Sequence, residues 1–240
     1  MDLSKVLEKE LLEGRFWTHS KTLVEGCTKV SPGCLNCWSE SMDMRFKKGG
    51  KPFDGTIVEH PERLLEILPK SGHRAPRVWT YWNDLFHKDV SVNLRNALFE
   101  RIKASKDYHI ICTKRPANAA TYLAGNAGFA RFYPPMDNVI ILVSMEDQRA
   151  VDARIPEVFE ISVNGWKVGG LFEPLLGPIE LQYTALSRLE WIICGPENGK
   201  GKRSFDGQWA MRLQAQAKAA GVPFFYKAGL LNGKRYIETP

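Results

Sequence analysis

Short runs of apolar, β-forming residues recur along the chain, and each is followed by a polar stretch. The runs predict seven strands, at residues 21–25, 77–82, 108–113, 138–144, 167–172, 190–195 and 222–227. Helical spacing follows most of them, at residues 37–46, 92–105, 116–124, 145–160 and 207–221. Strands that are apolar throughout and alternate with helices indicate an α/β fold, with parallel strands in βα units and both sheet faces covered. No linker-like change in composition and no repeat interrupts the series, so we expect a single domain over residues 1–240.

Polar groups able to do chemistry follow almost every predicted strand. They are Asn83 and Asp84, Lys114 and Arg115, Ser144 and Glu146, then Glu173, Glu197 and Lys227. A strand ends where polar residues begin, so part of this enrichment is automatic. In a parallel α/β barrel, however, all carboxyl ends of strands open onto one face, where the loops assemble the site. Charged groups at so many strand ends favour an active-site mouth.

Composition and charge narrow the setting without deciding the function. Hydrophobic residues make up 44% and charged residues 25%, as in an ordinary globular protein. The net charge of +6 is concentrated in local runs, which are Arg45, Lys47, Lys48 and Lys51, then Lys200, Lys202 and Arg203, and finally Lys234 and Arg235. Such runs can contact phosphates, or they can be solvated surface, and no recognised nucleic-acid motif accompanies them.

The amino-terminal segment is charged and amphipathic, and it lacks the apolar run of a signal peptide. No stretch approaches the roughly 18 apolar residues that span a bilayer. We therefore expect a cytoplasmic protein with no membrane partner.

Three of the five cysteines, Cys27, Cys34 and Cys37, lie in one short segment with six and then two residues between them. An odd number of clustered cysteines suggests metal chemistry in a reducing compartment rather than a disulfide scaffold. Structural zinc and a four-cysteine ferredoxin site both need a fourth ligand. Cys112 and Cys194 sit inside apolar strands and are interpreted as buried core thiols. A 4Fe–4S cluster with one iron left open to a small molecule explains the number three directly.

The cysteine segment, GCTKVSPGCLNCW, resembles the cluster loop of the radical S-adenosylmethionine superfamily, whose usual spacing is three and then two residues. The resemblance is closer to a phage-associated branch of that superfamily, largely of unknown function. It extends through NDLFHKDV, TKRP, EPLLGPI, WIICGPENG and GVPFFYK, in order along most of the chain. Two positions depart from the branch, since Trp38 replaces a tyrosine and Cys194 replaces a glycine.

This resemblance implies a partial, laterally open (β/α) barrel of about six to seven parallel strands. It implies a 4Fe–4S cluster on the three clustered cysteines, with S-adenosyl-L-methionine on the open iron. An electron from the cluster would cleave the sulfonium and generate a 5′-deoxyadenosyl radical, and the barrel would orient the reactants and exclude water. The electron would come from a reductant such as flavodoxin or ferredoxin.

The resemblance also implies, by position, which strand ends meet the cofactor. Asn83 and Asp84 are expected at the methionyl amine, while Ser144 and Glu146 are expected at the ribose or methionyl group. Glu197 is expected near the adenine or ribose, and Lys114 and Arg115 at the methionyl carboxylate or a substrate phosphate. Helix caps and solvated loops are the alternative roles for these residues. The scattered histidines His60, His73, His87 and His109 are interpreted as surface or core residues.

Phage radical enzymes are associated with hypermodified DNA, in which thymidine derivatives carry amino-acid adducts. We therefore favour a DNA-modifying enzyme of the isomerase type that acts on such an adduct, with a base flipped out of the duplex. Lys200, Lys202 and Arg203 are expected to contact DNA beside the mouth. A radical enzyme acting on tRNA, peptide or a metabolite is the rival within the class. A non-catalytic iron–sulfur or zinc nucleic-acid-binding protein is the rival outside it.

Overall fold

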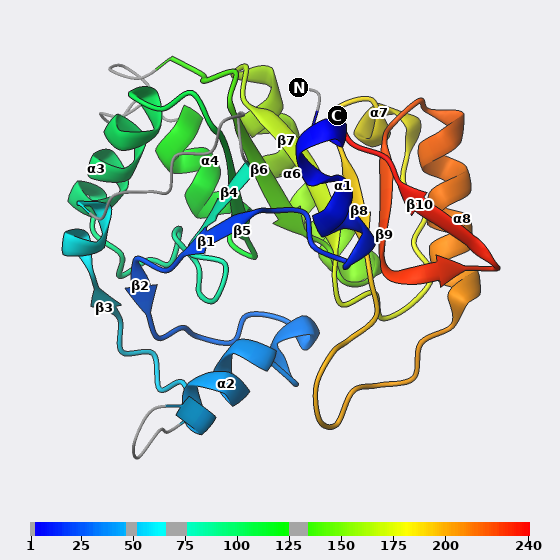
Figure 1. Cartoon of the computed structure of the whole chain (residues 1–240), viewed down its shortest axis with the longest axis horizontal. Helices are drawn as coiled ribbons and strands as arrows, with labels where there is room; N and C mark the ends of the chain where they lie inside the picture. Colours follow the sequence, from blue (N-terminus) through cyan, green and yellow to red (C-terminus); the bar gives the residue numbers. More distant parts are fainter. Residues whose placement is uncertain (1–2, 47–51, 66–75, 125–133) are drawn as a thin grey trace.

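An eight-stranded, mostly parallel sheet forms the centre of the protein (Figure 1). The computed structural model describes residues 3–46, 52–65, 76–124 and 134–240. In spatial order, the strands are β1 (His19–Lys21), β4 (Pro76–Trp79), β5 (Tyr108–Thr113), β6 (Val139–Ser144), β7 (Lys167–Phe172), β8 (Ile192–Cys194), β9 (Phe224–Leu231) and β10 (Lys234–Ile237). Neighbours from β1 to β9 pair in parallel, and β10 pairs antiparallel with β9.

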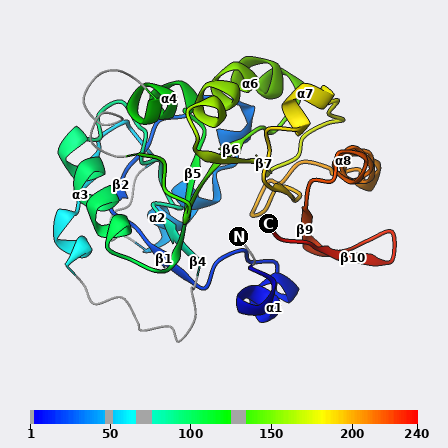
Figure 2. The same ribbon diagram turned by 90° about the horizontal axis from the view of Figure 1, so that it is seen from above.

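Most helices lie along one side of this sheet. They are α3 (Val92–Lys103), α4 (Pro116–Ala124), α6 (Gln148–Val163), α7 (Tyr183–Leu186) and α8 (Gly207–Ala219). The strands follow one another in chain order, and crossovers of one hand then place every connecting helix on the same face. Figure 2 shows the sheet curving, with these helices around its outer side. The sheet does not close, and β1 and β10 are its two edges.

The inner, concave side is filled by the amino-terminal helix α1 (Ser4–Leu12) (Figure 2). Leu3, Leu7 and Leu11 are buried and, at spacings of four residues, lie on one helical face. They pack in one cluster with alternate residues of the central strands, such as Ile110 and Leu142. The intervening residues of those strands pack against the outer helices, because successive side chains of a strand point to opposite faces. Hydrophobic cores on both faces explain why the strands are apolar throughout.

The predicted strand at residues 21–25 is wrong as a single element. His19–Lys21 forms β1 of the main sheet, whereas Val24–Glu25 forms β2, which pairs antiparallel with β3 (Val58–Glu59) in a separate two-stranded sheet. The chain therefore leaves the main sheet just before the cysteines. It continues through a short 3₁₀ turn, η1 (Pro32–Cys34), into α2 (Trp38–Phe46), which lies below the carboxyl edge of the sheet in Figure 1. A second 3₁₀ turn, η2 (Pro61–Leu64), follows β3.

The other strand predictions are confirmed with changes at their ends. Residues 108–113 and 167–172 match the observed strands, and 138–144 differs by one residue. The strand predicted at 77–82 ends at Trp79, because Thr80 adopts a positive φ of 55°. The strand predicted at 190–195 is shortened to Ile192–Cys194, and the one at 222–227 becomes Phe224–Leu231.

The hairpin between β9 and β10 was missed, although its turn has a sequence signature. Asn232 and Gly233 have positive φ values of 48° and 73°. Asn-Gly is the preferred pair for a two-residue turn between antiparallel strands. Within the described ranges, no helix combines the length and apolar character needed to cross a membrane.

Candidate functional site

The loops at the carboxyl ends of the parallel strands meet the cysteine loop around one cavity of about 970 Å³, a volume that includes open solvent. Residues from both parts line the cavity, namely Cys27, Cys34 and Cys37 with Asn83, Asp84, Lys114, Arg115, Ser144 and Glu197. The structure therefore brings together most of the site residues predicted from the sequence.

Two glycines allow the cysteine loop to lie against its neighbours. Gly26 has a φ of +82°, and a Cβ built there would lie 1.8 Å from the carbonyl oxygen of Thr56. A Cβ on Gly33 would lie 2.9 Å from the Cδ of Glu146. Any larger residue at Gly26 would therefore need both a strained backbone and a shift of the facing chain.

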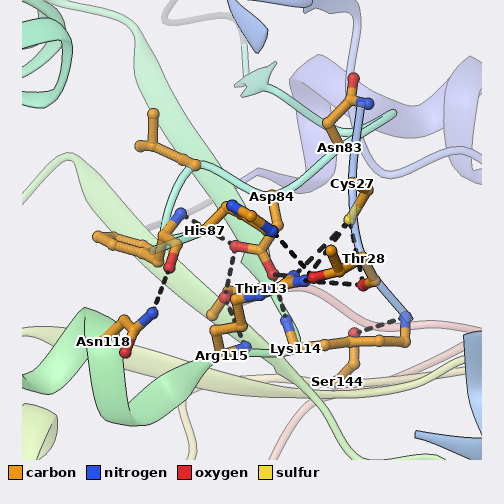
Figure 3. Close-up of polar contacts among 12 residues, drawn as sticks. Cys27, Thr28, Asn83, Asp84, His87, Thr113, Lys114, Arg115, Asn118 and Ser144 are labelled. Atoms are coloured by element: carbon orange, nitrogen blue, oxygen red, sulfur yellow. Dashed lines mark hydrogen bonds and ion pairs between the residues drawn. The ribbon is translucent and has the colours of Figure 1, made fainter. Parts of the chain in front are cut away.

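Cys27 is held by Arg115, which comes from the loop after β5 (Figure 3). Both terminal nitrogens of the Arg115 guanidinium lie 3.7 Å from the Cys27 sulfur. The same guanidinium donates to the carbonyl oxygen of Thr28 at 2.7 Å and to its hydroxyl at 2.8 Å. Burial raises the pKa of the Cys27 thiol, and the neighbouring positive charge of Arg115 opposes that rise. A cation beside this sulfur suits a thiolate that is ligated to metal.

Asp84 orients Arg115 rather than facing the cavity with free oxygens. Its buried carboxylate accepts four hydrogen bonds: from the Phe86 and Lys114 amides at 3.0 Å, the Thr113 hydroxyl at 2.8 Å and the Arg115 guanidinium at 2.9 Å. These bonds saturate the carboxylate, so its geometry favours a structural role over contact with a methionyl amine.

His87 belongs to the support of the cysteine loop and is not merely a core residue. Its ring is 1% exposed, and Nε2 lies 2.9 Å from the Thr28 hydroxyl. The Asp89 amide donates to Nδ1 at 3.3 Å, so Nε2 carries the proton and donates to Thr28. Burial, together with the nearby Arg115, lowers the pKa of His87 and keeps the ring neutral. Asn83 adds a further clamp by donating to the Gly26 carbonyl at 3.0 Å.

Glu146 holds the middle of the cysteine loop. Its fully buried carboxylate accepts from the Gly33 amide at 3.3 Å and from Arg154 at 2.7 Å. Burial alone would raise the pKa of Glu146, but Arg154 and Ser31 outweigh it and lower the pKa overall. Ser144 faces the cavity, with its hydroxyl 3.4 Å from the Lys114 ammonium.

Glu197 holds the end of the cysteine loop. It accepts from the Asn36 amide at 3.0 Å and is paired with Arg203, whose hydrogen bond lowers the pKa of Glu197 to about 2. Arg203 also donates to the Pro32 carbonyl at 3.0 Å. These bonds occupy Arg203, whereas Lys200 and Lys202 in the same loop are exposed.

The other predicted positive run is only partly visible. Arg45 is exposed near the end of α2, whereas Lys47, Lys48 and Lys51 lie outside the described residues.

The cysteines differ in what they can offer a metal. None of the five forms a disulfide. Cys27, Cys34 and Cys37 are half-buried on the cavity, whereas Cys112 is a buried thiol in the cavity wall and Cys194 is buried outside the lining. Burial raises the pKa of both strand thiols strongly, which makes them poor ligands.

Across the part of the chain that the structure describes, no three His, Cys, Asp or Glu side chains already converge at metal-binding distance. The three loop thiols nevertheless fit an iron–sulfur cluster by donor chemistry, since cysteine thiolates are its usual ligands.

A second polar cluster on the same cavity was not assigned from the sequence, although Glu173 and Lys227 stood among the polar strand ends. Glu173 directly follows β7, and its carboxylate oxygens lie 2.6 and 2.5 Å from the Lys227 ammonium. Tyr81, beyond β4, lies beside both groups, and Glu173 and Tyr81 line the cavity. Tyr81 was expected inside a strand, because the positive φ of Thr80 that ends β4 before it could not be foreseen from the sequence.

The fold and the site together define an open, mostly parallel α/β protein with a cysteine-lined cavity at the carboxyl edge of its sheet. A family model described as "Protein of unknown function (DUF5131)" matches residues 15–234, and the chain belongs to this family. Comparison with curated proteins and with solved structures gives no significant match.

Proposed function

We propose that this protein is a radical S-adenosylmethionine enzyme whose 4Fe–4S cluster binds to Cys27, Cys34 and Cys37. The observation that carries the proposal is that three free thiols of one loop line a single cavity, at the edge where parallel sheets bind ligands. The two remaining cysteines are buried in strands, which leaves a fourth coordination position for S-adenosyl-L-methionine.

The chain's own residues would hold and orient the loop. Arg115 donates toward the Cys27 sulfur and is itself fixed by Asp84. Glu146 and Glu197 fix the middle and end of the loop through Gly33 and Asn36. When bound, the cluster would supply the electron that cleaves S-adenosylmethionine into methionine and a 5′-deoxyadenosyl radical.

Lys114 and Ser144 are the cavity-facing polar groups best suited to the cofactor. The Lys114 ammonium carries a positive charge into the cavity, and a methionyl carboxylate is its natural partner. The Ser144 hydroxyl can donate to or accept from a ribose hydroxyl. Asp84, Glu146 and Glu197 would act on the cofactor indirectly, by positioning these elements.

We further propose that the substrate is a hypermodified thymidine in DNA, rearranged by an isomerase-type reaction. The exposed Lys200 and Lys202 flank Gly201, whose carbonyl accepts from Asn36 of the cysteine loop, so both could contact phosphates beside the cavity. The resemblance to phage radical enzymes suggests the amino-acid adduct.

Anaerobic reconstitution with iron and sulfide tests the cluster. The wild-type chain should take up about four irons and, on reduction, convert S-adenosylmethionine to 5′-deoxyadenosine. Alanine at any one of Cys27, Cys34 or Cys37 should abolish the brown absorbance. Alanine at Cys194, the matched buried control, should retain it, and so should alanine at Cys112.

Tight stoichiometric zinc without iron uptake would overturn the proposal in favour of a zinc-binding module. A stable cluster that never cleaves S-adenosylmethionine would favour a non-catalytic iron–sulfur protein. The substrate is tested separately, by mass spectrometry of nucleosides from phage DNA made with and without the gene. Unchanged nucleosides would move tRNA, peptide or metabolite substrates ahead of DNA.

A further inference from the structure

The cavity has a second polar centre, formed by Tyr81, Glu173 and Lys227. The ammonium of Lys227 lies 5.3 Å from the ring centroid of Phe16 and 5.7 Å from that of Trp17. It also lies 5.9 Å from the ring centroid of Tyr81. These rings and Glu173 surround the ammonium, whose side chain is only 12% exposed.

Glu173 is the member of this centre that lines the cavity with weakly bonded acceptor oxygens. Its oxygens accept from Lys227, from Asn198 at 3.4 Å and, at the limiting distance of 3.5 Å, from the Tyr81 hydroxyl. A carboxylate has about four acceptor positions, and the two longest of these contacts are weak. A ligand N–H at a shorter distance would therefore replace the weak Tyr81 bond to Glu173 Oε2.

An aromatic wall adjoins this carboxylate. Trp38, Tyr81 and Trp82 all line the cavity. The Trp38 ring centroid lies 5.6 Å from that of Tyr81, with an interplanar angle of 37°, and 5.1 Å from that of Trp82. Aromatic side chains of this kind are platforms on which nucleobases stack.

We infer that this end of the cavity is the subsite for the substrate's base, a pyrimidine whose ring N–H donates to Glu173 while its face lies on the aromatic wall. The inference rests on the proposed function and adds the chemistry by which the substrate is recognised. Lys227 neutralises Glu173, so the centre suits an uncharged N–H donor better than a free ammonium or a phosphate. Once the ring N–H has replaced its bond to Glu173, the Tyr81 hydroxyl, a neutral phenol whose pKa burial raises well above 10, can donate its one proton to a neighbouring carbonyl of the ring.

Nucleoside titration of the chain without a cluster tests the subsite apart from the radical chemistry. The two probes are thymidine and 3-methylthymidine, which lacks the ring N–H. Their binding is measured by saturation-transfer NMR. Wild-type protein should bind thymidine about tenfold more tightly than 3-methylthymidine, as expected for a hydrogen bond to a charged acceptor. In Glu173→Leu, which has no acceptor, that preference should vanish, whereas the exposed control Glu190→Leu should keep it.

Loss of Glu173 also leaves the Lys227 ammonium buried without its partner, which could unfold the variant. The double variant Glu173→Leu with Lys227→Met removes both charges and the acceptor, and it should likewise lose the preference while remaining folded. Equal binding of the two probes by wild-type protein would overturn the inference.

Adenosine is the third probe, because the aromatic wall could instead bind the adenine of S-adenosylmethionine. If adenosine binds and thymidine does not, the wall belongs to the adenine of S-adenosylmethionine and the inference fails. If thymidine fails to bind while 5′-deoxyadenosine is formed, the inference fails and the radical function stands. If thymidine shows the expected preference but no cluster assembles, the base subsite stands and the proposed function fails.

Discussion

Replacing Asp84 by asparagine should destabilise the protein far more than the size of the change suggests. The carboxylate is 4% exposed, and its Oδ2 accepts from two donors, the Lys114 amide and the Arg115 guanidinium. Its Oδ1 accepts from two more, the Phe86 amide and the Thr113 hydroxyl. An asparagine NH₂ group placed on either side would face donors, because all four partners donate.

The cost follows from the ion pair and from the lost acceptor. Removing one partner of a buried ion pair costs about 3–5 kcal/mol, since the remaining charge is left uncompensated. The side chain of Arg115 is 10% exposed, which places the pair in this class. For a chain of this size, each 1 kcal/mol lowers the melting temperature by about 2–4 °C. We therefore expect a decrease of about 6–20 °C.

Differential scanning fluorimetry at neutral pH measures this effect, and Asp89→Asn is the matched control. Asp89 lies in the same loop but is 49% exposed and pairs with an exposed Lys88. An exposed pair contributes about 0–1 kcal/mol, so the control should shift by only a few degrees. The Asp84 variant should also bind less iron on reconstitution, because Arg115 loses its anchor beside Cys27.

Equal melting temperatures for the two variants would refute the argument, because they would show that the Asp84 carboxylate is not a buried, saturated acceptor. A large stability loss with normal iron binding would separate the fold from the cluster. It would remove Arg115 from the proposed support of Cys27.

Three further predictions concern other positions around the site and in β9. Gly229→Ala should lower the free energy of unfolding by about 1–2 kcal/mol, because alanine disfavours its positive φ. Gly26→Ala should lower it clearly more, because its new Cβ would also clash with the Thr56 carbonyl oxygen. Equal losses of melting temperature for the two variants would contradict the clash. Glu197→Gln should lower stability at pH 7 by at most about 3 kcal/mol. In the folded protein the pKa of Glu197 is about 2, below the usual 4.5, so the extra stability of the wild-type protein is present above about pH 4.5 and disappears as pH falls toward 2. A stability difference between wild type and variant that stays constant from pH 6 to pH 2 would refute this. Replacing Lys200 and Lys202 by alanine should flatten the slope of log DNA affinity against log salt by up to about 1.8, and an unchanged slope would mean that neither contacts phosphate.

Much of the α/β framework could be predicted from the sequence, because each central strand is apolar on both faces. Residues 108–113 and 167–172 matched the observed strands for this reason. The ends of strands were harder to predict, since 77–82 and 190–195 were predicted with the same length as 108–113 but form shorter strands. The strand predicted at 21–25 failed because the apolar pattern does not record which sheet a residue joins: Lys21 ends β1, whereas Val24 and Glu25 pair with β3.

The candidate site was predicted as a set of residues, but the hydrogen bonds that join them were not. Parallel strands deliver their carboxyl ends to one edge, so polar residues after several strands were expected to meet there. Which of them face the cavity depends on hydrogen bonds between distant segments. The Asp84 carboxylate, for example, accepts from Lys114 and Arg115 in the loop after β5, contacts that no local pattern encodes.

The sequence by itself determined the cysteine spacing, the parallel α/β pattern and the polar strand ends, because these depend on local periodicity and residue type. Only the tertiary structure decided that Arg203 is occupied by Glu197, that His87 supports the cysteine loop through Thr28, and that Glu173 pairs with Lys227. The physical reason is that a hydrogen bond or ion pair depends on distances and burial at the scale of an ångström. Those are set by the packing of the whole chain.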